Sequence, residues 1–304
     1  MQKTTYQRTE YVRDNLMNRR LALQGLAVAA GGSLALGACS RLEMFDAIAL
    51  RDDGASRVAT GIAYGPDPRQ KLDIYAPPGA SNAPVVVFFY GGSWNSGERV
   101  DYGFLGTALA AQGFVTVLPD YRLVPDVRFP AFVDDGAAAT AWVERQIGRY
   151  GGSGQRVVLA GHSAGAYIAS MVALAPSYLE KAGSRAQPRG FAGLAGPYDF
   201  MPFQYRSIID AFGSWPRPVE TQPVAFARPG APPALLLQGS DDTTVPPRHA
   251  KALAERLKAA GNDVELLIYD GVDHIDIMIS ISRLLRDRAN TLADLSRFVR
   301  RVTA

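Results

Sequence analysis

The sequence predicts an α/β fold in which a mostly parallel sheet is covered by helices on both faces. Strand-like and helix-like segments alternate along the chain, and the strand-like segments are nearly continuous apolar runs, as expected for strands buried on both sides. Neither an internal repeat nor an interdomain linker interrupts residues 58–304, so we expect one domain there. The strands are expected at Lys71–Tyr75, Val85–Tyr90, Val115–Pro119, Val157–Ala160, Leu235–Gln238 and Val264–Tyr269.

Apolar residues at helical spacing place the helices between these strands. Arg248–Ala260 has Ala250, Leu253 and Leu257 on one face, as an amphipathic surface helix should. The helices are expected near Phe104–Ala111, Asp135–Tyr150, Ala164–Ala175, Arg248–Ala260 and Leu284–Val302. Ala195–Pro233 is irregular and rich in aromatic residues and proline. We interpret it as a small cap, with ordinary loop packing against the core as the alternative.

The segment Gly161–Gly165, with the sequence GHSAG, is the most informative of the chain. It follows the apolar run Arg156–Ala160 and precedes a helix-like run. A serine at such a strand-to-helix turn is held on a strained corner, and flanking glycines let the backbone turn sharply and a substrate approach. Ser163 is therefore the candidate nucleophile.

A second buried strand, Ala83–Tyr90, runs into the glycine turn Gly91–Trp94. Acyl transfer needs backbone N–H groups directed at a developing oxyanion, and residues without bulky side chains let the backbone come close. We predict one donor in the Gly92–Ser93 stretch and the other at Ala164, directly after the serine.

Two downstream strands end in acidic turns. Ala234–Gln238 leads into Gly239–Pro246, which contains two adjacent aspartates, and Val264–Tyr269 leads into a turn that ends at His274. The chain order is therefore serine, aspartate, histidine, an order that one large class of serine enzymes uses.

The chain has three histidines, and elimination selects His274 as the general base. His162 neighbours Ser163 on the turn, where adjacent side chains diverge. His249 begins an amphipathic helix and is predicted to be a surface residue. His274 lies in a loop after a strand, from which an imidazole can reach the serine. The residues alone leave Asp199, Asp241, Asp242 and Asp273 open as the acid.

From about residue 58 to its end, the chain resembles the bacterial carboxylesterase group of α/β-hydrolases, which includes feruloyl-esterase-like, acetyl-esterase-like and kynurenine-formamidase-like enzymes. The residues that carry the resemblance are Tyr90–Trp94, Asp120–Leu123 with Phe129–Ala131, Gly161–Gly165, Gly239–Pro246 and the turn before His274. The resemblance implies an α/β-hydrolase fold and a serine carboxylic-ester hydrolase that forms an acyl-enzyme. The family spacing selects Asp242, three residues before the valine of Val245-Pro246, as the acid that orients His274.

Other residues are expected to have supporting roles. Asp120 and Asp135 are expected to be structural, with Arg122 pairing a carboxylate. Trp94 and the aromatic cap could line a pocket for an aryl or short-acyl ester. The family usually has histidine where this chain has Tyr90; that residue braces the oxyanion loop, a task that a tyrosine hydroxyl could also perform.

Two alternatives remain open from the sequence. An amidase, formamidase or small-peptide hydrolase would use the same three residues. A catalytically silent envelope-binding lipoprotein could have inherited the fold without the chemistry, although all three residues are present.

The N-terminal segment predicts export. Residues 1–38 contain Arg19 and Arg20 followed by an apolar stretch of small residues, typical of a signal peptide, and Met17 is a possible true start. Residues 36–39 read LGAC and resemble a bacterial lipobox, in which Cys39 is lipidated; the arginine pair more weakly resembles a twin-arginine signal. We expect residues 39–57 to be a tether and the protein to be lipid-anchored in the bacterial envelope, facing the periplasm.

Composition excludes several other classes. Of the 32 basic and 29 acidic residues, five and two lie in residues 1–38, which leaves 27 of each sign, so charge gives no argument for nucleic-acid binding. The single cysteine excludes a disulfide framework. No phosphate loop, dinucleotide fingerprint or metal-ligand spacing is present, so no cofactor or metal is implied. The expected partners are a small ester substrate and a membrane; the oligomeric state stays open.

Overall fold

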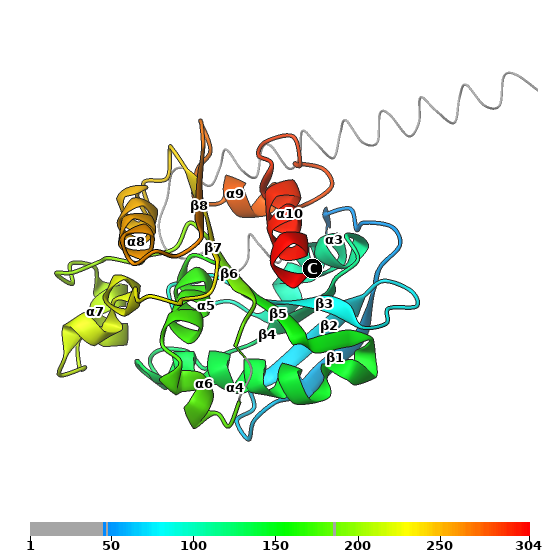
Figure 1. Cartoon of the computed structure of the whole chain (residues 1–304), viewed down its shortest axis with the longest axis horizontal. Coiled ribbons are helices and arrows are strands. Elements are labelled where there is room, and N and C mark those ends of the chain that lie inside the picture. The colour runs from blue at the N-terminus through cyan, green and yellow to red at the C-terminus, as the bar shows by residue number, and fades with distance from the viewer. Residues whose placement is uncertain (1–44, 47, 185–186) are drawn as a thin grey trace, which may run out of the picture.

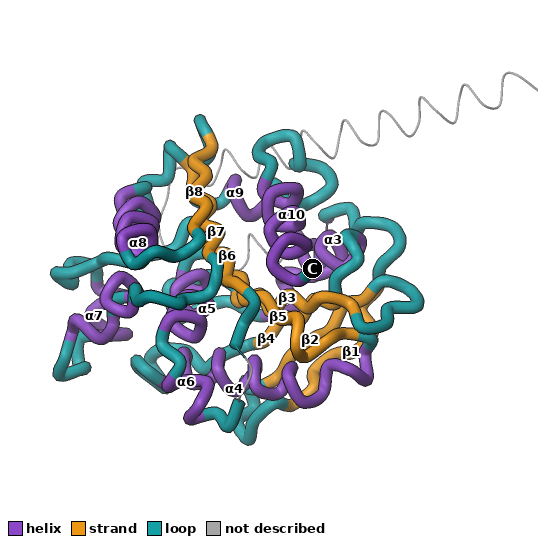
Figure 2. Tube along the Cα trace, in the orientation of Figure 1, coloured by secondary structure: helices purple, strands orange, loops and turns teal. Residues whose placement is uncertain are grey.

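An eight-stranded sheet forms the centre of the computed structural model, which describes residues 45–46, 48–184 and 187–304 (Figures 1 and 2). The spatial order is β1-β2-β4-β3-β5-β6-β7-β8. The pairs β1–β2 and β2–β4 are antiparallel and all other pairs are parallel, which confirms the predicted mostly parallel sheet. The strands are β1 (Ser56–Ala63), β2 (Lys71–Ala76), β3 (Ala83–Phe89), β4 (Val115–Pro119), β5 (Gly152–His162), β6 (Gly190–Leu194), β7 (Ala234–Gly239) and β8 (Val264–Tyr269).

Helices cover both faces of the sheet. In Figure 1, α3 and α10 lie on one side of β3 and β5, and α4, α5 and α6 lie on the other. Within the described residues, no helix has both the length and the apolar character needed to cross a membrane. The helices are α3 (Gly103–Ala111), α4 (Ala131–Gln146), α5 (Ala164–Leu174), α6 (Ser177–Lys181), α7 (Arg206–Phe212), α8 (Arg248–Ala259), α9 (Asp276–Ile279) and α10 (Thr291–Thr303), and the short 3₁₀ turns are η2 (Arg99–Tyr102), η3 (Ile147–Tyr150), η4 (Pro218–Thr221) and η5 (Pro223–Phe226).

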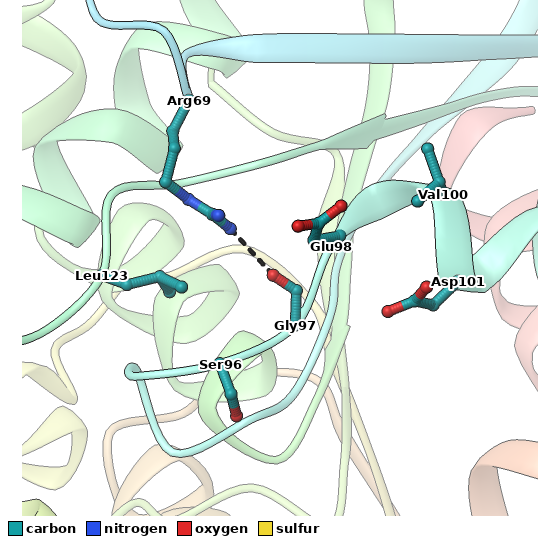
Figure 3. Close-up of a pocket in the computed structure, with 7 residues that line it drawn as sticks. All are labelled: Arg69, Ser96, Gly97, Glu98, Val100, Asp101 and Leu123. Carbon is teal, nitrogen blue, oxygen red and sulfur yellow. Dashed lines mark hydrogen bonds between the residues drawn. The ribbon is translucent and has the colours of Figure 1, made fainter. Parts of the chain in front are cut away.

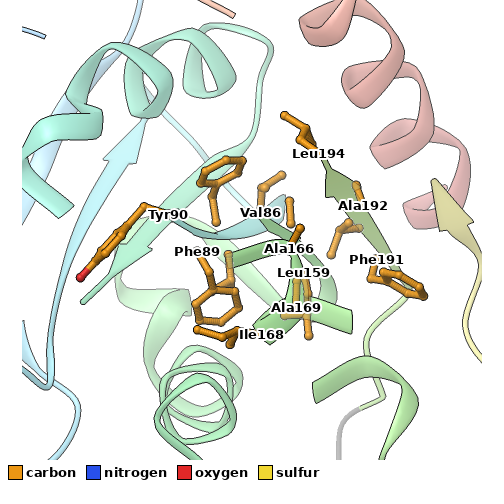
Figure 4. Close-up of a cluster of buried hydrophobic side chains, with 14 of the residues drawn as sticks. Val86, Phe89, Tyr90, Leu159, Ala166, Ile168, Ala169, Phe191, Ala192 and Leu194 are labelled. Atoms are coloured by element: carbon orange, nitrogen blue, oxygen red, sulfur yellow. The ribbon is translucent and has the colours of Figure 1, made fainter. Parts of the chain in front are cut away.

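The core lies between the central strands and the helices that cover them. Figure 4 shows Phe89 of β3 and Leu159 of β5 against Ile168 of α5, and all three side chains are fully buried. Burying such a side chain contributes about 1.5–3 kcal/mol relative to leaving it exposed. This packing holds β5 and α5, and therefore the turn between them, in a fixed position.

Two strands were not predicted. β1 is a half-exposed edge strand interrupted by Gly61, and β6 is a five-residue run with two glycines. Neither has the continuous β-branched pattern typical of a strand. β6 forms because it pairs with β5 on one side and β7 on the other.

Several predicted boundaries are wrong. α4 starts at Ala131, four residues before Asp135, and α10 starts at Thr291 because residues 284–290 form turns and irregular structure instead of a helix. The described part of the predicted tether packs onto the domain: Phe45 is 6% exposed and meets Phe104 edge-on at 5.0 Å. The predicted signal segment 1–38 and Cys39 lie outside the described residues.

The predicted cap, residues 195–233, contains α7, η4 and η5. Phe200 and Phe212 of this segment are buried and pack against Trp94, with ring centroids 6.3 and 4.8 Å away. The segment therefore closes over the start of α5 and the glycine turn after β3 by aromatic packing, which adds about 0.5–1.5 kcal/mol per ring pair beyond area burial.

Candidate active site

The turn between β5 and α5 places Ser163 at a strained corner. Its φ is 54° and ψ is −121°, which lies outside the regions that residues with a side chain usually adopt. Gly165 makes this turn possible, because a Cβ there would lie 2.0 Å from the Phe89 carbonyl oxygen. The packed core on both sides therefore holds the serine in a conformation that costs about 1–3 kcal/mol.

Ser163, His274 and Asp242 form one continuous hydrogen-bonded chain. His274 Nε2 lies 3.0 Å from the Ser163 hydroxyl oxygen, and His274 Nδ1 lies 2.8 Å from Asp242 Oδ2. Both distances are within hydrogen-bond range. Three segments that are far apart in the sequence thus bring together the serine, histidine and aspartate that were predicted.

The Asp242 carboxylate is buried and accepts several hydrogen bonds. Its Oδ1 accepts the N–H groups of Thr244 and Val245 at 2.9 and 2.8 Å, and its Oδ2 also accepts Gln238 Nε2 at 3.0 Å. Burial acts to raise the pKa of this carboxyl, but the hydrogen bonds and the positive charge available on His274 outweigh it and lower the pKa. Asp242 is therefore ionised and can accept the His274 Nδ1–H.

The neighbouring acids have other positions. Asp241 is exposed and accepts the Ser240 hydroxyl, and Asp273 accepts the N–H groups of Ile275 and Asp276 in the turn after His274. Asp199 is exposed. Of the four aspartates that the residues alone left open, Asp242 makes the hydrogen bond to His274.

The glycine turn after β3 lies beside the serine. A Cβ at Gly91 would be 3.1 Å from Ser163 Cβ, and one at Gly92, where φ is +125°, would be 2.2 Å from the Ser96 carbonyl oxygen. Among the described residues, the N–H groups of Gly92, Ser93 and Ala164 have no hydrogen-bond acceptor. These are the groups that the sequence predicts for oxyanion binding.

Tyr90 anchors the base of this turn in a buried charged network. Its hydroxyl donates to Asp120 at 3.0 Å and accepts Arg69 Nη2 at 3.0 Å, and the same Nη2 donates to the Gly97 carbonyl at 2.8 Å. Burial and the Asp120 charge raise the pKa of Tyr90 well above its ordinary value, so the phenol stays neutral and can donate. Arg99 completes the network by pairing with Asp120.

Arg69 also lines a pocket with residues of the segment that follows the glycine turn (Figure 3). The pocket has a volume of about 380 Å³ and contains none of Ser163, His274 and Asp242. Its lining residues are Arg69, Ser96, Gly97, Glu98, Val100, Asp101 and Leu123.

Trp94, predicted to contact substrate, is only 3% exposed. Its ring packs edge-on against Tyr167 and Phe212, so in this structure it is part of a buried aromatic cluster. A contact with substrate stays a prediction.

The ion pair expected between Arg122 and a structural carboxylate is present. Arg122 donates to the Asp135 carboxylate through both its Nε and Nη2 groups.

The prediction for His249 is wrong. Its side chain is 4% exposed, because the cap folds over it and the Asp199 N–H lies 3.4 Å from its Nδ1. Burial and nearby Arg248 lower its pKa to about 4. The amphipathic pattern of α8 marks one buried face but does not show that the cap covers its first turn.

Sequence reasoning missed Gln238, which holds both Asp242 and the Val245 carbonyl. The available signal was a single polar residue at the end of the apolar run Leu235–Leu237, because a buried polar side chain needs partners. Arg69 gave no comparable signal, since it lies in a loop between β1 and β2.

The fold and the serine–histidine–aspartate chain define an α/β-hydrolase. A family model described as BD-FAE matches residues 72–214, and one described as TAP-like protein matches residues 203–283. The chain is therefore similar to esterase families of this superfamily.

Two curated relatives illustrate the similarity. The chain is 31% identical over 248 residues to a probable isoprenylcysteine alpha-carbonyl methylesterase of Arabidopsis thaliana, covering 74% of this chain and 59% of that protein. It is 31% identical over 241 residues to the esterase LipC of Mycobacterium tuberculosis, covering 70% and 58%. The chain therefore spans a little under three fifths of these curated relatives.

Among solved structures, esterase 2 of Thermogutta terrifontis has the same fold. It superimposes with a TM-score of 0.67 at 24% identity and covers 82% of this chain and 95% of its own. That esterase has been solved with butyrate bound, and its form phosphorylated by paraoxon is also known.

Proposed function

We propose that this protein is a carboxylic-ester hydrolase that works through an acyl-enzyme on Ser163. The observation that carries the proposal is the hydrogen-bonded chain from the strained Ser163 through His274 to the buried, ionised Asp242. The esterase relatives support the same chemistry, as does the phosphorylation of the Thermogutta esterase by paraoxon.

Each residue then has a defined role. Ser163 Oγ attacks the ester carbonyl while its proton passes to His274 Nε2, and Asp242 orients the imidazole and stabilises the imidazolium. The N–H groups of Gly92 or Ser93 and of Ala164 stabilise the oxyanion. His274 returns the proton to the leaving alcohol as the ester C–O bond breaks. Water, with its proton taken by His274, then releases the acid from the serine.

The substrate class we propose is an aryl or short-acyl ester. The butyrate complex of the Thermogutta esterase supports a short acyl group. The aryl part of the proposal rests on the aromatic composition of residues 195–233, because Trp94 and the rings of Phe132 and Phe212 that it contacts are buried.

The test compares hydrolysis of p-nitrophenyl acetate and butyrate by the wild-type protein and its Ser163→Ala variant. Loss of the nucleophile should lower kcat by up to about 10⁶-fold. The ratio of acetate to butyrate rates reports on the acyl pocket. Equal, weak rates in both proteins would contradict the proposal. Faster hydrolysis of the corresponding p-nitroanilides than of these esters would favour the amidase alternative.

We also propose that residues 1–38 are a lipoprotein-type signal and that a lipid on Cys39 anchors the protein in the bacterial envelope. The support is the basic pair Arg19-Arg20, the apolar stretch after it and the LGAC sequence. Expressed in a bacterium, the wild-type protein should enter the detergent phase of a Triton X-114 separation, and Cys39→Ala should stay in the aqueous phase. Finding both proteins in the aqueous phase would contradict the anchor.

A further inference from the structure

His162 is a buried imidazole beside the active site to which the proposed mechanism gives no task. It is the last residue of β5, directly before Ser163, and its side chain is 3% exposed. Its ring centroid lies 4.8 Å from that of His274. The sequence excluded it as the base, and the structure agrees that His274, not His162, contacts the serine hydroxyl.

The His162 ring is bonded to the main chain of His274. His162 Nε2 lies 2.8 Å from the His274 carbonyl oxygen. A carbonyl can only accept, so the proton of the imidazole is on Nε2. Nδ1 has no hydrogen-bond partner among the described residues and faces Gly91, where a Cβ would lie 2.9 Å away.

The ring is therefore fixed between the glycine turn and the histidine loop. Burial, together with the nearby His274, lowers the pKa of His162 to about 3, so the ring is neutral near pH 7. A neutral donor at this position adds no positive charge against the imidazolium that forms on His274 during the reaction.

The loop that carries His274 is tied to its surroundings at several points, and the His274 carbonyl is one of them. Residues 270–275 lie outside the helices and strands, between β8 and α9. The neighbouring backbone is tied at Val272, whose carbonyl accepts the Asp241 N–H, and at Asp273. The hydrogen bond from His162 is the one recorded for the His274 carbonyl among the described residues.

We propose that His162 is a positioning residue. Its Nε2–H group ties the loop that carries His274 to the turn that carries Ser163. This hydrogen bond keeps His274 Nε2 within hydrogen-bonding distance of the Ser163 hydroxyl. This inference rests on the proposed esterase function. It assigns the histidine of the GHSAG segment a task that is separate from proton transfer.

The kinetic test uses His162→Leu, which removes the donor, and His162→Gln, whose amide N–H can replace it. Misplacing a catalytic group by about 1 Å can cost on the order of 10²-fold. We expect His162→Leu to lower kcat by about this factor with little change in KM, and His162→Gln to recover most of it. The control is His249→Leu, which also removes a buried imidazole and should lower the melting temperature without the loss of kcat.

The outcomes separate the two proposals. If wild type is active and Ser163→Ala is not, but His162→Leu matches wild type in kcat, the positioning role is wrong and the esterase function stands. If wild type and Ser163→Ala are equally inactive, the esterase function itself fails.

A measurement on the wild-type protein covers the case in which the variants do not fold. ¹⁵N-edited NMR of the histidine rings at neutral pH should show His162 protonated on Nε2 and bare on Nδ1. A proton on Nδ1 would break the hydrogen bond to the His274 carbonyl and overturn the inference.

Discussion

At the scale of single residues, the two adjacent aspartates of the turn after β7 differ sharply in environment. Asp242 is buried and bonds His274 at 2.8 Å, whereas Asp241 is exposed and its carboxylate accepts the Ser240 hydroxyl. Their chemistry is the same, so the difference in their roles follows from position alone.

This pair gives a matched test of the acid. Asp242→Asn should lower kcat by about 10⁴-fold, because an amide cannot hold the His274 tautomer or stabilise the imidazolium. Asp241→Asn should leave kcat within a small factor of wild type. Steady-state kinetics on p-nitrophenyl butyrate measures both, and equal losses in the two variants would contradict the assignment of Asp242.

At the scale of elements, the site depends on how closely β3, β5 and α5 approach one another. Gly165 has no room for a side chain, since a Cβ would collide with the Phe89 carbonyl oxygen at 2.0 Å. The collision is with backbone, which cannot move aside as a flexible side chain can. The glycine is thus required by packing as well as by access to the serine.

We expect Gly165→Ala to lower the free energy of unfolding by about 3 kcal/mol or more, through overpacking of a dense core. Gly148→Ala is the matched control, because nothing lies within 4 Å of a Cβ there; its change should stay within about 0.5 kcal/mol. Urea denaturation of both variants measures the difference. A Gly165→Ala protein as stable as the control would show that the turn can open.

At the scale of the whole molecule, two neutral histidines are buried within the fold. Burial lowers the pKa of His162 to about 3 and that of His249 to about 4. In the unfolded chain both take up protons below pH of about 6.5. Between these values the unfolded state binds more protons, so the free energy of unfolding must fall as the pH falls.

The expected contribution is up to about 1.4 kcal/mol per pH unit for each histidine, starting near pH 6.5 and continuing until the folded histidine titrates. His249→Gln should therefore lose less stability than wild type between pH 7 and pH 5. Lys251→Gln, an exposed substitution on the same helix, should behave like wild type. Urea denaturation at the two pH values tests this prediction. The same loss of unfolding free energy between pH 7 and pH 5 in all three proteins would refute it.

How much of the molecule the sequence could predict depends on how local each signal is. The six predicted strands form, and Ser163 lies on the predicted turn, because apolar runs and a glycine-flanked serine are patterns within about ten residues. β6 could not be predicted in this way, since its short glycine-containing segment becomes a strand by pairing with β5 and β7.

The sequence by itself determined the fold class, the serine on its turn and, by elimination among three histidines, the residue that meets it. Only the tertiary structure decided that Asp242 bonds His274, that His249 is buried and that His162 bonds the His274 backbone. The reason is physical: the contact between His274 and Ser163 joins residues 111 positions apart, and that between His274 and Asp242 joins residues 32 apart. Such distances are set by the packing of the whole sheet, which no local pattern contains.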